Sequence, residues 1–184
     1  MTQELIVLVD DAGLPIGEVE KYSSHHANTP LHNAFSCYVF NEKGEFLATQ
    51  RAHSKKVWPD VWTNTVCGHP APGESIIDAM KRRLNYELGM TADDFKVLLP
   101  DYRYKTPPYN GIIENEICPV YIARATSQPV PNPAEVEDYK WMKWDDYVSA
   151  CETDTGDIWS WWCKDQLKHL KTHTLIAEYS LQSK

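Results

Sequence analysis

Residues 68–90 read GHPAPGESIIDAMKRRLNYELGM, and this stretch decides the fold. From Ser75 to Leu88 the apolar residues Ile77, Met80, Leu84 and Leu88 recur at helical spacing. Ser75 and Asp78 resemble a capping box, and Gly89 supplies a stop signal. We therefore expect one helix here, entered from a proline-containing loop.

Strand-like segments surround this helix. The expected hairpins are Leu5–Val9 with Ile16–Glu20 and Ala34–Phe40 with Phe46–Gln50, each around a turn that contains glycine. Further strand-like runs are Val97–Tyr104, Ile112–Ala123 and Tyr139–Trp144. Residues from about Ser160 to Leu181 contain no Pro or Gly and are expected to form one long helix. Mixed strands with helices on their faces predict an α/β sandwich, and no repeat or linker divides the chain.

Composition excludes several classes of function. The 184 residues include 18 Lys and Arg against 26 Asp and Glu, a formal net charge of −8, which disfavours nucleic acid and anionic membranes as partners. The N-terminal segment has no basic region before its short apolar run, so we expect no signal peptide, no spanning helix and a cytoplasmic location. The five cysteines are scattered without a Cys-x-x-Cys pair, which argues against a disulfide framework or a structural zinc cluster.

Two glutamates and several histidines are candidate metal ligands. Glu114 and Glu116 lie two apart in a strand-like run, so their side chains are expected on the same face, where a cation would relieve their repulsion. Taken alone, the pattern favours a solvated edge with two exposed acids, because such Glu-x-Glu pairs are common. Imidazole nitrogen with carboxylate oxygen suits zinc, manganese or iron. His25, His32 and His69 lie in polar segments, but the residues alone do not exclude His26 and His53, or a set of plain surface histidines.

One thiol and two basic clusters are further candidates. Cys67 precedes Gly68 and His69 and is a candidate reactive thiol, although most free cysteines are buried hydrophobic residues. The basic clusters suit a small anion such as a diphosphate. They consist of Arg51, Lys55 and Lys56, and of Lys81, Arg82 and Arg83, with solvated charge the better interpretation for Lys56 and Lys81.

The stretch 68–90 resembles a degraded Nudix box. That motif is Gly-x5-Glu-x7-Arg-Glu-apolar-x-Glu-Glu-x-Gly-apolar, which places carboxylates on one helix face to hold Mg²⁺ for pyrophosphate hydrolysis. The matching positions are Gly68, Glu74, Arg82 and Glu87-Leu88-Gly89-Met90. Arg83 and Tyr86 stand where the motif has glutamates, and the loss of these two carboxylates argues against ordinary hydrolysis.

Over nearly its full length the chain also resembles the type I isopentenyl-diphosphate isomerases, which are Nudix-like in fold. The combination of Cys67-Gly68-His69-Pro70 with Glu114-Asn115-Glu116 is highly specific for that family. Other matches are Lys21-Tyr22, His25, Leu31-His32, Arg51, Ser54-Lys55-Lys56, Trp58-Pro59, Trp62-Thr63-Asn64, Gly73-Glu74, Arg82-Arg83, Tyr86-Glu87-Leu88-Gly89 and Tyr104. Near the tail the family commonly has Phe-Ser/Thr-Pro-Trp, whereas this chain has Ile158-Trp159-Ser160-Trp161. The resemblance implies one Nudix-like α/β/α sandwich with mixed sheets, spanning residues 1–184.

The resemblance also implies a reaction and a role for each site residue. Isopentenyl diphosphate would be converted to dimethylallyl diphosphate, for isoprenoid biosynthesis, by protonation and deprotonation through a tertiary carbocation. Cys67 and Glu116 would exchange protons with opposite faces of the substrate, Tyr104 would assist Glu116, and Trp161 would cover the cation. One divalent ion, Mn²⁺, Zn²⁺ or Mg²⁺, would be held by His25, His32, His69, Glu114 and Glu116. The diphosphate would be held by Lys21, Arg51, Lys55 and Arg83, with Mg²⁺ near Glu87.

Two other functions remain as alternatives. A Nudix pyrophosphohydrolase acting on a nucleoside diphosphate derivative would need the carboxylate-rich helix that this chain lacks. A non-catalytic metal- or nucleotide-binding module would leave Cys67 without a role. For the isomerase we expect a monomer whose partner is the small diphosphate substrate.

Overall fold

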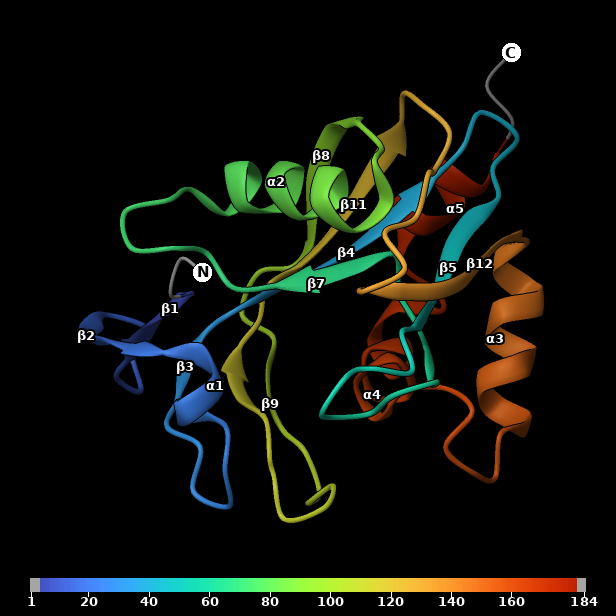
Figure 1. The fold of residues 1–184 in the computed structure, drawn as a ribbon. Coiled ribbons are helices and arrows are strands. Elements are labelled where there is room, and N and C mark those ends of the chain that lie inside the picture. The colour runs from blue at the N-terminus through green and yellow to red at the C-terminus, as the bar shows by residue number, and fades with distance from the viewer. Residues whose placement is uncertain (1–3, 182–184) are drawn as a thin grey trace.

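The structure is a computed structural model that describes residues 4–181 (Figure 1). Its strands are β1 (Leu5–Val9), β2 (Pro15–Glu20), β3 (His32–Asn33), β4 (Phe35–Phe40), β5 (Phe46–Arg51), β6 (Trp62–Thr63), β7 (Val66–Gly68), β8 (Ala92–Leu99), β9 (Arg103–Lys105), β10 (Asn115–Ile117), β11 (Val120–Ala125) and β12 (Val136–Met142). Its helices are α1 (Lys21–Ser24), α2 (Ile76–Leu88), α3 (Trp144–Thr153), α4 (Trp161–Leu170) and α5 (Thr174–Ser180).

The strands form two mixed sheets. The smaller sheet has the order β2-β1-β3-β10-β9, and the larger has the order β12-β5-β4-β11-β8, with β6 paired to β5 and β7 paired to β4. In each sheet one pair is parallel, β3 with β10 and β4 with β11, and these two pairs run consecutively along the same two chain segments. The smaller sheet therefore continues from the end of the larger one, on the left in Figure 1.

Helices cover both faces of the larger sheet, which confirms the predicted α/β sandwich. Strand β4 is buried along its whole length. Its residues Phe35, Cys37 and Val39 pack in one apolar cluster with helix α2, whereas Tyr38 and Phe40 pack in a second cluster with helices α3, α4 and α5. Because successive strand residues point to opposite faces, these two clusters are the two cores of the sandwich.

Helix α2 confirms the helix expected from residues 68–90. The Ser75 side chain accepts a hydrogen bond from the backbone N–H of Asp78, and Gly89 ends the helix in the left-handed region at φ 54°. The buried face carries Met80, Leu84 and Leu88 as expected, but Ile77 is 40% exposed. The inward position at the start of the helix belongs instead to Ile76, which packs against the core.

Two expected strand runs are wrong as single strands, because each passes from one sheet to the other. The run Val97–Tyr104 contains the end of β8 and the start of β9, and the run Ile112–Ala123 contains β10 and part of β11. Pro100 and Pro119 lie at the crossings. Proline has no backbone N–H to donate to a ladder, so it favours an interruption at these points.

The expected C-terminal organisation also needs correction. The long helix is divided into α4 and α5, because the His173 side chain accepts a hydrogen bond from Leu175 N–H and begins a second helix. The strand expected at Tyr139–Trp144 ends at Met142, and Trp144 begins helix α3. That helix has no side-chain cap at Lys143, and the signal left at its start is the acidic first turn of Asp145 and Asp146. It is held by the burial of Trp144, Tyr147 and Cys151.

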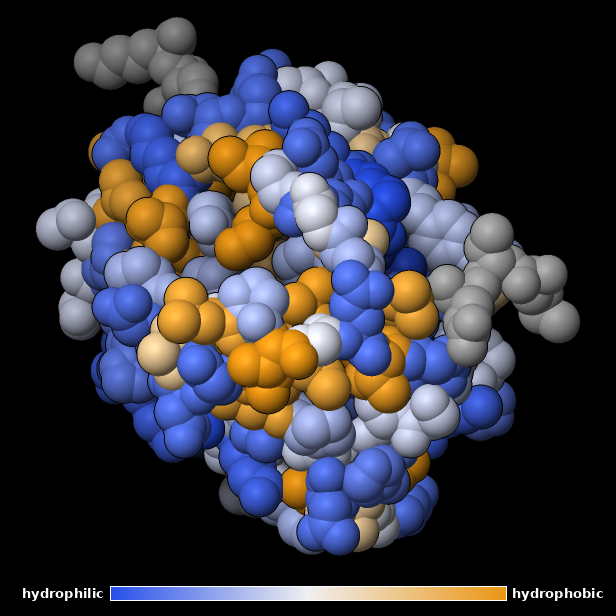
Figure 2. Space-filling view, turned by 90° about the vertical axis from the view of Figure 1, so that its left-hand side faces the viewer, coloured by the Kyte–Doolittle hydropathy of each residue, from blue (hydrophilic) through white to orange (hydrophobic). Residues whose placement is uncertain are grey.

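Polar and apolar side chains alternate in patches on the face turned toward the viewer in Figure 2. Within residues 4–181, no helix combines the length and apolar character needed to cross a membrane.

Candidate active site between the two sheets

The smaller sheet places three predicted site residues in one row across neighbouring strands. Glu116 in β10 is paired with His32 of β3 on one side and with Tyr104 of β9 on the other. Side chains of directly opposed residues point to the same face of a sheet. All three residues are at least 90% buried, so the row forms an enclosed wall. Glu114 precedes β10 by one residue, so the expectation that both glutamates lie within one strand is wrong, although both reach the same site.

The larger sheet contributes Cys67 from β7, where it is paired with Ser36 of β4. The Cys67 thiol lies 3.1 Å from Oδ1 of Asn64, which accepts its hydrogen bond, and 3.4 Å from the Ser36 hydroxyl. Burial raises the pKa of Cys67 to about 12. The residue is therefore a neutral thiol at physiological pH, capable of acting as a proton donor.

A cavity of about 600 Å³ lies between these two walls. It brings together most of the predicted site residues. The predicted residues that line it are Lys21, His25, Arg51, Lys55, Cys67, His69, Arg83, Glu87, Tyr104, Glu114 and Glu116. His32 lies behind His69, in contact with it and fully buried, and does not line the cavity.

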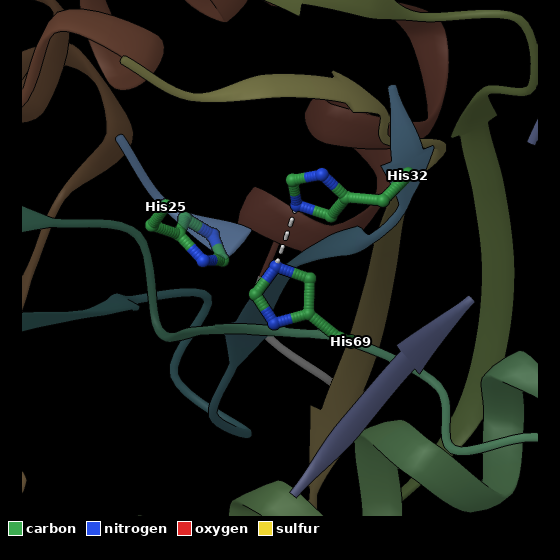
Figure 3. A group of neighbouring side chains, drawn as sticks. All are labelled: His25, His32 and His69. Atoms are coloured by element: carbon green, nitrogen blue, oxygen red, sulfur yellow. Dashed lines mark hydrogen bonds between the residues drawn. The ribbon is translucent and has the colours of Figure 1, made fainter. Parts of the chain in front are cut away.

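Three histidines converge at one end of the cavity (Figure 3). His32 donates from Nδ1 to the carbonyl of Pro30 at 2.9 Å, so a neutral ring has a lone pair at Nε2. That nitrogen lies 3.2 Å from Nε2 of His69 and 3.6 Å from Glu116 Oε1. His69 Nε2 is itself 3.2 Å from the same glutamate oxygen. Three electron-rich atoms this close together require a proton or a metal ion among them.

His25 and Glu114 complete the cluster. His25 donates from Nδ1 to the carbonyl of Lys21 at 2.6 Å, and its Nε2 lies 3.1 Å from Oε2 of Glu114. Despite this close approach, within residues 4–181 the buried Oε2 of Glu114 has no partner with hydrogen-bond geometry, and neither has the buried Nδ1 of His69. Two groups of three residues each have their ligand atoms within 4.8 Å of one another. One group is His25, His32 and His69, and the other is His32, Glu114 and Glu116. This donor set fits a divalent metal ion.

The protonation states of this cluster also suit a cation. Burial lowers the pKa of His69 to about 4, which keeps its imidazole neutral at physiological pH. Burial alone would raise the pKa of Glu116, but the adjacent imidazoles of His32 and His69 outweigh it and hold that pKa well below its ordinary value. Neutral imidazole and ionised carboxylate are the forms that bind metals.

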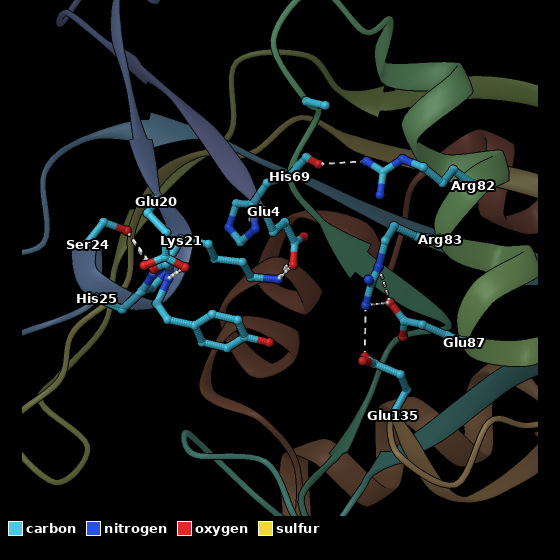
Figure 4. Close-up of polar contacts among 12 residues, drawn as sticks. Glu4, Glu20, Lys21, Ser24, His25, His69, Arg82, Arg83, Glu87 and Glu135 are labelled. Atoms are coloured by element: carbon cyan, nitrogen blue, oxygen red, sulfur yellow. Dashed lines mark hydrogen bonds and ion pairs between the residues drawn. The ribbon is translucent and has the colours of Figure 1, made fainter. Parts of the chain in front are cut away.

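Basic side chains also line the cavity, and Figure 4 shows Lys21 and Arg83 with their acidic partners. Arg83 forms ion pairs with Glu87 at 2.7 Å and Glu135 at 2.8 Å, and Lys55 also pairs with Glu135. Lys21 pairs with Glu4 at 3.1 Å. Arg51 instead donates to the backbone carbonyls of Trp58 and Val57, both at 2.9 Å, and within residues 4–181 it forms no ion pair. Its charge is therefore uncompensated beside the cavity.

Trp161, the predicted cover for a cation, does not line the cavity. Its ring stacks on Tyr104 with centroids 5.9 Å apart, whereas the neighbouring Trp162 lines the cavity. Ser160 is the N-cap of α4, so Trp161 and Trp162 are the first two helical residues and point about 100° apart around the helix axis. The family spacing of Ser-Pro-Trp places tryptophan two residues after serine. Two residues after Ser160 is Trp162, so this spacing was the sequence signal that could have identified Trp162.

Sequence reasoning also missed two polar residues. Asn64 accepts hydrogen bonds from Cys67 and from Nε1 of Trp162, and its amide donates to the carbonyls of Cys37 and Val66. It thereby fixes both cavity-lining side chains. Glu135 lies in a loop far from any recognised motif and had no signal. The alternatives His26 and His53 are both exposed and lie outside the cluster.

Comparison with known proteins agrees with this geometry. Residues 30–162 match the NUDIX domain family. A crystal structure from Deinococcus radiodurans superposes with a TM-score of 0.69 at 16% identity, covering 90% of this chain and 98% of that one. A MutT NUDIX hydrolase from Burkholderia pseudomallei gives a TM-score of 0.55 at 19% identity, covering 76% and 98%. At these identities the superpositions establish the fold alone.

Sequence relatives are much nearer. An isopentenyl-diphosphate Delta-isomerase of Saccharopolyspora erythraea is 49% identical over 167 residues, covering 91% of this chain and 86% of the relative. One of Salmonella arizonae is 44% identical over 180 residues, covering 98% of both. With its NUDIX domain fold and its site between two sheets, this chain belongs to the isopentenyl-diphosphate Delta-isomerase family.

Proposed function

We propose that this chain converts isopentenyl diphosphate to dimethylallyl diphosphate in isoprenoid biosynthesis. The observation that carries the proposal is the position of Cys67 and Glu116. These residues come from different sheets and line one cavity, which is also lined by candidate metal ligands and by basic side chains. The reaction needs two proton-transferring groups on opposite sides of a small alkene whose diphosphate is held nearby.

We assign the proton transfers to Cys67 and Glu116. Protonation of an unactivated alkene produces a tertiary carbocation, and loss of a proton from C2 then yields the product. Tyr104 neighbours Glu116 across the sheet, and burial raises the pKa of its hydroxyl well above the ordinary value, so it stays protonated and can donate a hydrogen bond to the glutamate side. Burial of these groups keeps water from capturing the cation.

We assign metal binding to the cluster of His25, His32, His69, Glu114 and Glu116. These residues would hold Mn²⁺, Zn²⁺ or Mg²⁺, and the ion would supply positive charge that sets the position and acidity of Glu116. Lys21, Arg51, Lys55 and Arg83 would bind the diphosphate together with Mg²⁺ near Glu87. Glu87 is the carboxylate that the degraded Nudix box retains on the cavity side.

Trp162 takes the role that sequence analysis gave to Trp161. Its ring lines the cavity and already has a cation over its face, since the Arg51 guanidinium carbon lies 5.7 Å from the ring centroid. An indole face stabilises positive charge, including that of a carbocation. Nε1 donates to Thr63 Oγ1 at 2.8 Å, which fixes the orientation of the ring.

The pyrophosphohydrolase alternative has less support. The guanidinium of Arg83 stands where a Nudix hydrolase has a metal-binding carboxylate, and it is hydrogen-bonded to Glu87. A non-catalytic binding module would not explain a buried neutral thiol opposite a glutamate. We also propose that one chain acts as a single-domain monomer, since the described chain itself supplies the residues assigned to the site. The cytoplasmic location expected from the sequence stays part of this proposal.

Proton NMR of isopentenyl diphosphate with the protein and Mg²⁺ in D₂O tests the proposed reaction. We expect dimethylallyl methyl signals to grow with deuterium incorporated, and we expect no such growth with Cys67→Ala. Release of phosphate or of isopentenol would indicate a hydrolase. Stoichiometric binding without turnover would indicate a binding module.

A further inference from the structure

Glu135 occupies a position that the proposed reaction does not explain. Its carboxylate lies among the cations assigned to the diphosphate, where a negative charge opposes the binding of an anion. One oxygen, Oε2, accepts hydrogen bonds from both Arg83, at 2.8 Å, and Lys55. The side chain is 13% exposed, and those of Lys55 and Arg83 are 24% and 10% exposed. The charge is therefore built into the wall of the cavity.

The backbone around Glu135 connects three parts of this wall. Its carbonyl accepts from Ala52 N–H at 3.0 Å, just beyond β5, and its N–H donates to the Asn132 carbonyl at 2.9 Å. Asn132 N–H in turn donates to the carbonyl of Glu87 near the end of α2. The carboxylate is thus fixed relative to helix α2, which carries Arg83, and to the segment after β5, which carries Lys55.

Two neighbouring cations in a half-buried cavity repel each other and would separate toward solvent unless an anion lies between them. Burial lowers the pKa of Lys55 despite its contact with Glu135, so the environment already disfavours its charged form. The contacts with carboxylates use Nε and Nη2 of Arg83, and in the described part of the chain Nη1 has no hydrogen-bond partner. The lysine ammonium has three donors and spends one on Glu135. Donors therefore remain for phosphate oxygens.

We propose that Glu135 is a positioning residue for the diphosphate, acting through Lys55 and Arg83. It holds the two cations at one fixed separation before substrate arrives, so that binding does not have to order two long side chains. Its own charge is offset by the two cations it holds. This inference rests on the proposed function for the identity of the substrate, but it concerns the binding of a diphosphate group and can be tested without turnover.

The test compares Glu135→Gln with Glu137→Gln, a matched control. Glu137 is exposed, lies two residues along the same segment and loses the same charge. The probe is inorganic diphosphate, titrated calorimetrically into the metal-loaded protein with and without added Mg²⁺. If Glu135 only repelled the anion, its neutralisation would tighten diphosphate binding, whereas Glu137 does not line the cavity. The positioning role predicts that Glu135→Gln weakens binding about tenfold in both conditions, because the cation geometry is lost, while the control changes less than about twofold.

Kinetics give an independent readout. We expect Glu135→Gln to raise KM for isopentenyl diphosphate by about the same factor as the diphosphate dissociation constant and to change kcat much less. Glu135→Asp keeps the charge with a shorter reach and should recover part of the lost affinity. If Glu135→Gln does not fold, as judged by thermal melting, Glu135→Asp carries the test against the parent protein.

Diphosphate binding by the folded variant that equals or exceeds that of the parent would overturn the proposal. Weakening seen only with added Mg²⁺ would also overturn it, since Glu135 would then act on the metal ion and not through the two side chains. If the parent shows no isomerisation, the proposed function fails, but the diphosphate affinities still decide the role of Glu135.

Discussion

Replacement of Trp162 is the sharpest test of how the carbocation is stabilised. A cation over an indole face that is shielded from water gains about 2 kcal/mol, which corresponds to roughly a 30-fold change in rate. Trp162 is 5% exposed, so its face is shielded in this way. We therefore expect Trp162→Leu to lower kcat by roughly 30-fold and Trp162→Phe, which keeps a weaker aromatic face, to fall between Leu and the parent.

The structure also says what else these substitutions remove. The hydrogen bonds from Nε1 to Thr63 at 2.8 Å and Asn64 at 3.2 Å are lost in both variants, which costs stability of about 1 kcal/mol and is measured separately by thermal melting. Binding of inorganic diphosphate should change only modestly, because Arg51 loses its contact with the Trp162 ring but stays bonded to the carbonyls of Trp58 and Val57. Trp161→Leu is the matched control, because this ring stacks on Tyr104 and does not line the cavity.

The assay is kcat and KM for isopentenyl diphosphate at saturating metal, with detection of any tertiary alcohol formed by water capture. Equal kcat for Trp162→Leu and Trp162→Phe would refute a role for the aromatic face and would leave Trp162 as a plug against water. A larger loss of kcat in Trp161→Leu than in Trp162→Leu would refute the assignment of the cation to Trp162.

Three further predictions concern proton transfer and metal binding. Cys67→Ala should nearly abolish turnover while leaving inorganic diphosphate binding intact, and more than about a tenth of parental turnover would be too small a loss for a proton-transferring group. Glu116→Gln should lower activity more than Glu114→Gln, because only Glu116 is assigned both metal binding and proton transfer. Metal content and activity measured on the same samples test this ranking. An inactive Glu114→Gln with full metal content would contradict it. In the metal-free protein, burial lowers the pKa of His25, but the contact with Glu114 outweighs burial and raises that pKa in the folded state. The contact should therefore stabilise the fold fully below the ordinary histidine pKa of about 6.5. This contribution should be lost as the pH rises through the pKa of His25 in the folded protein. Denaturant unfolding of the parent and Glu114→Gln across this pH range measures the difference, which should shrink at high pH; a difference that is constant with pH would exclude the linkage.

Local patterns determined much of this protein. Helix α2 could be predicted because its start at Ser75 and its stop at Gly89 act through adjacent backbone groups, which need no tertiary contact. The candidate ligands and the thiol could be identified because the family resemblance is carried by short contiguous motifs around Cys67 and Glu116. Helix α3 was missed because it begins without a cap, and its stability comes from burying Trp144 and Tyr147 in the core.

Only the tertiary structure decided which residues meet. Glu116 contacts His32 because β3 and β10 pair in parallel at that register, and a shift by one residue would have turned the glutamate to the opposite face. Trp162 and not Trp161 lines the cavity because helix α4 begins after Ser160, which fixes the directions of both rings. Glu135 joins Lys55 and Arg83 across segments that share no local pattern. Contacts of this kind depend on how distant elements pack against one another, and a single sequence carries no periodic or capping signal for that packing.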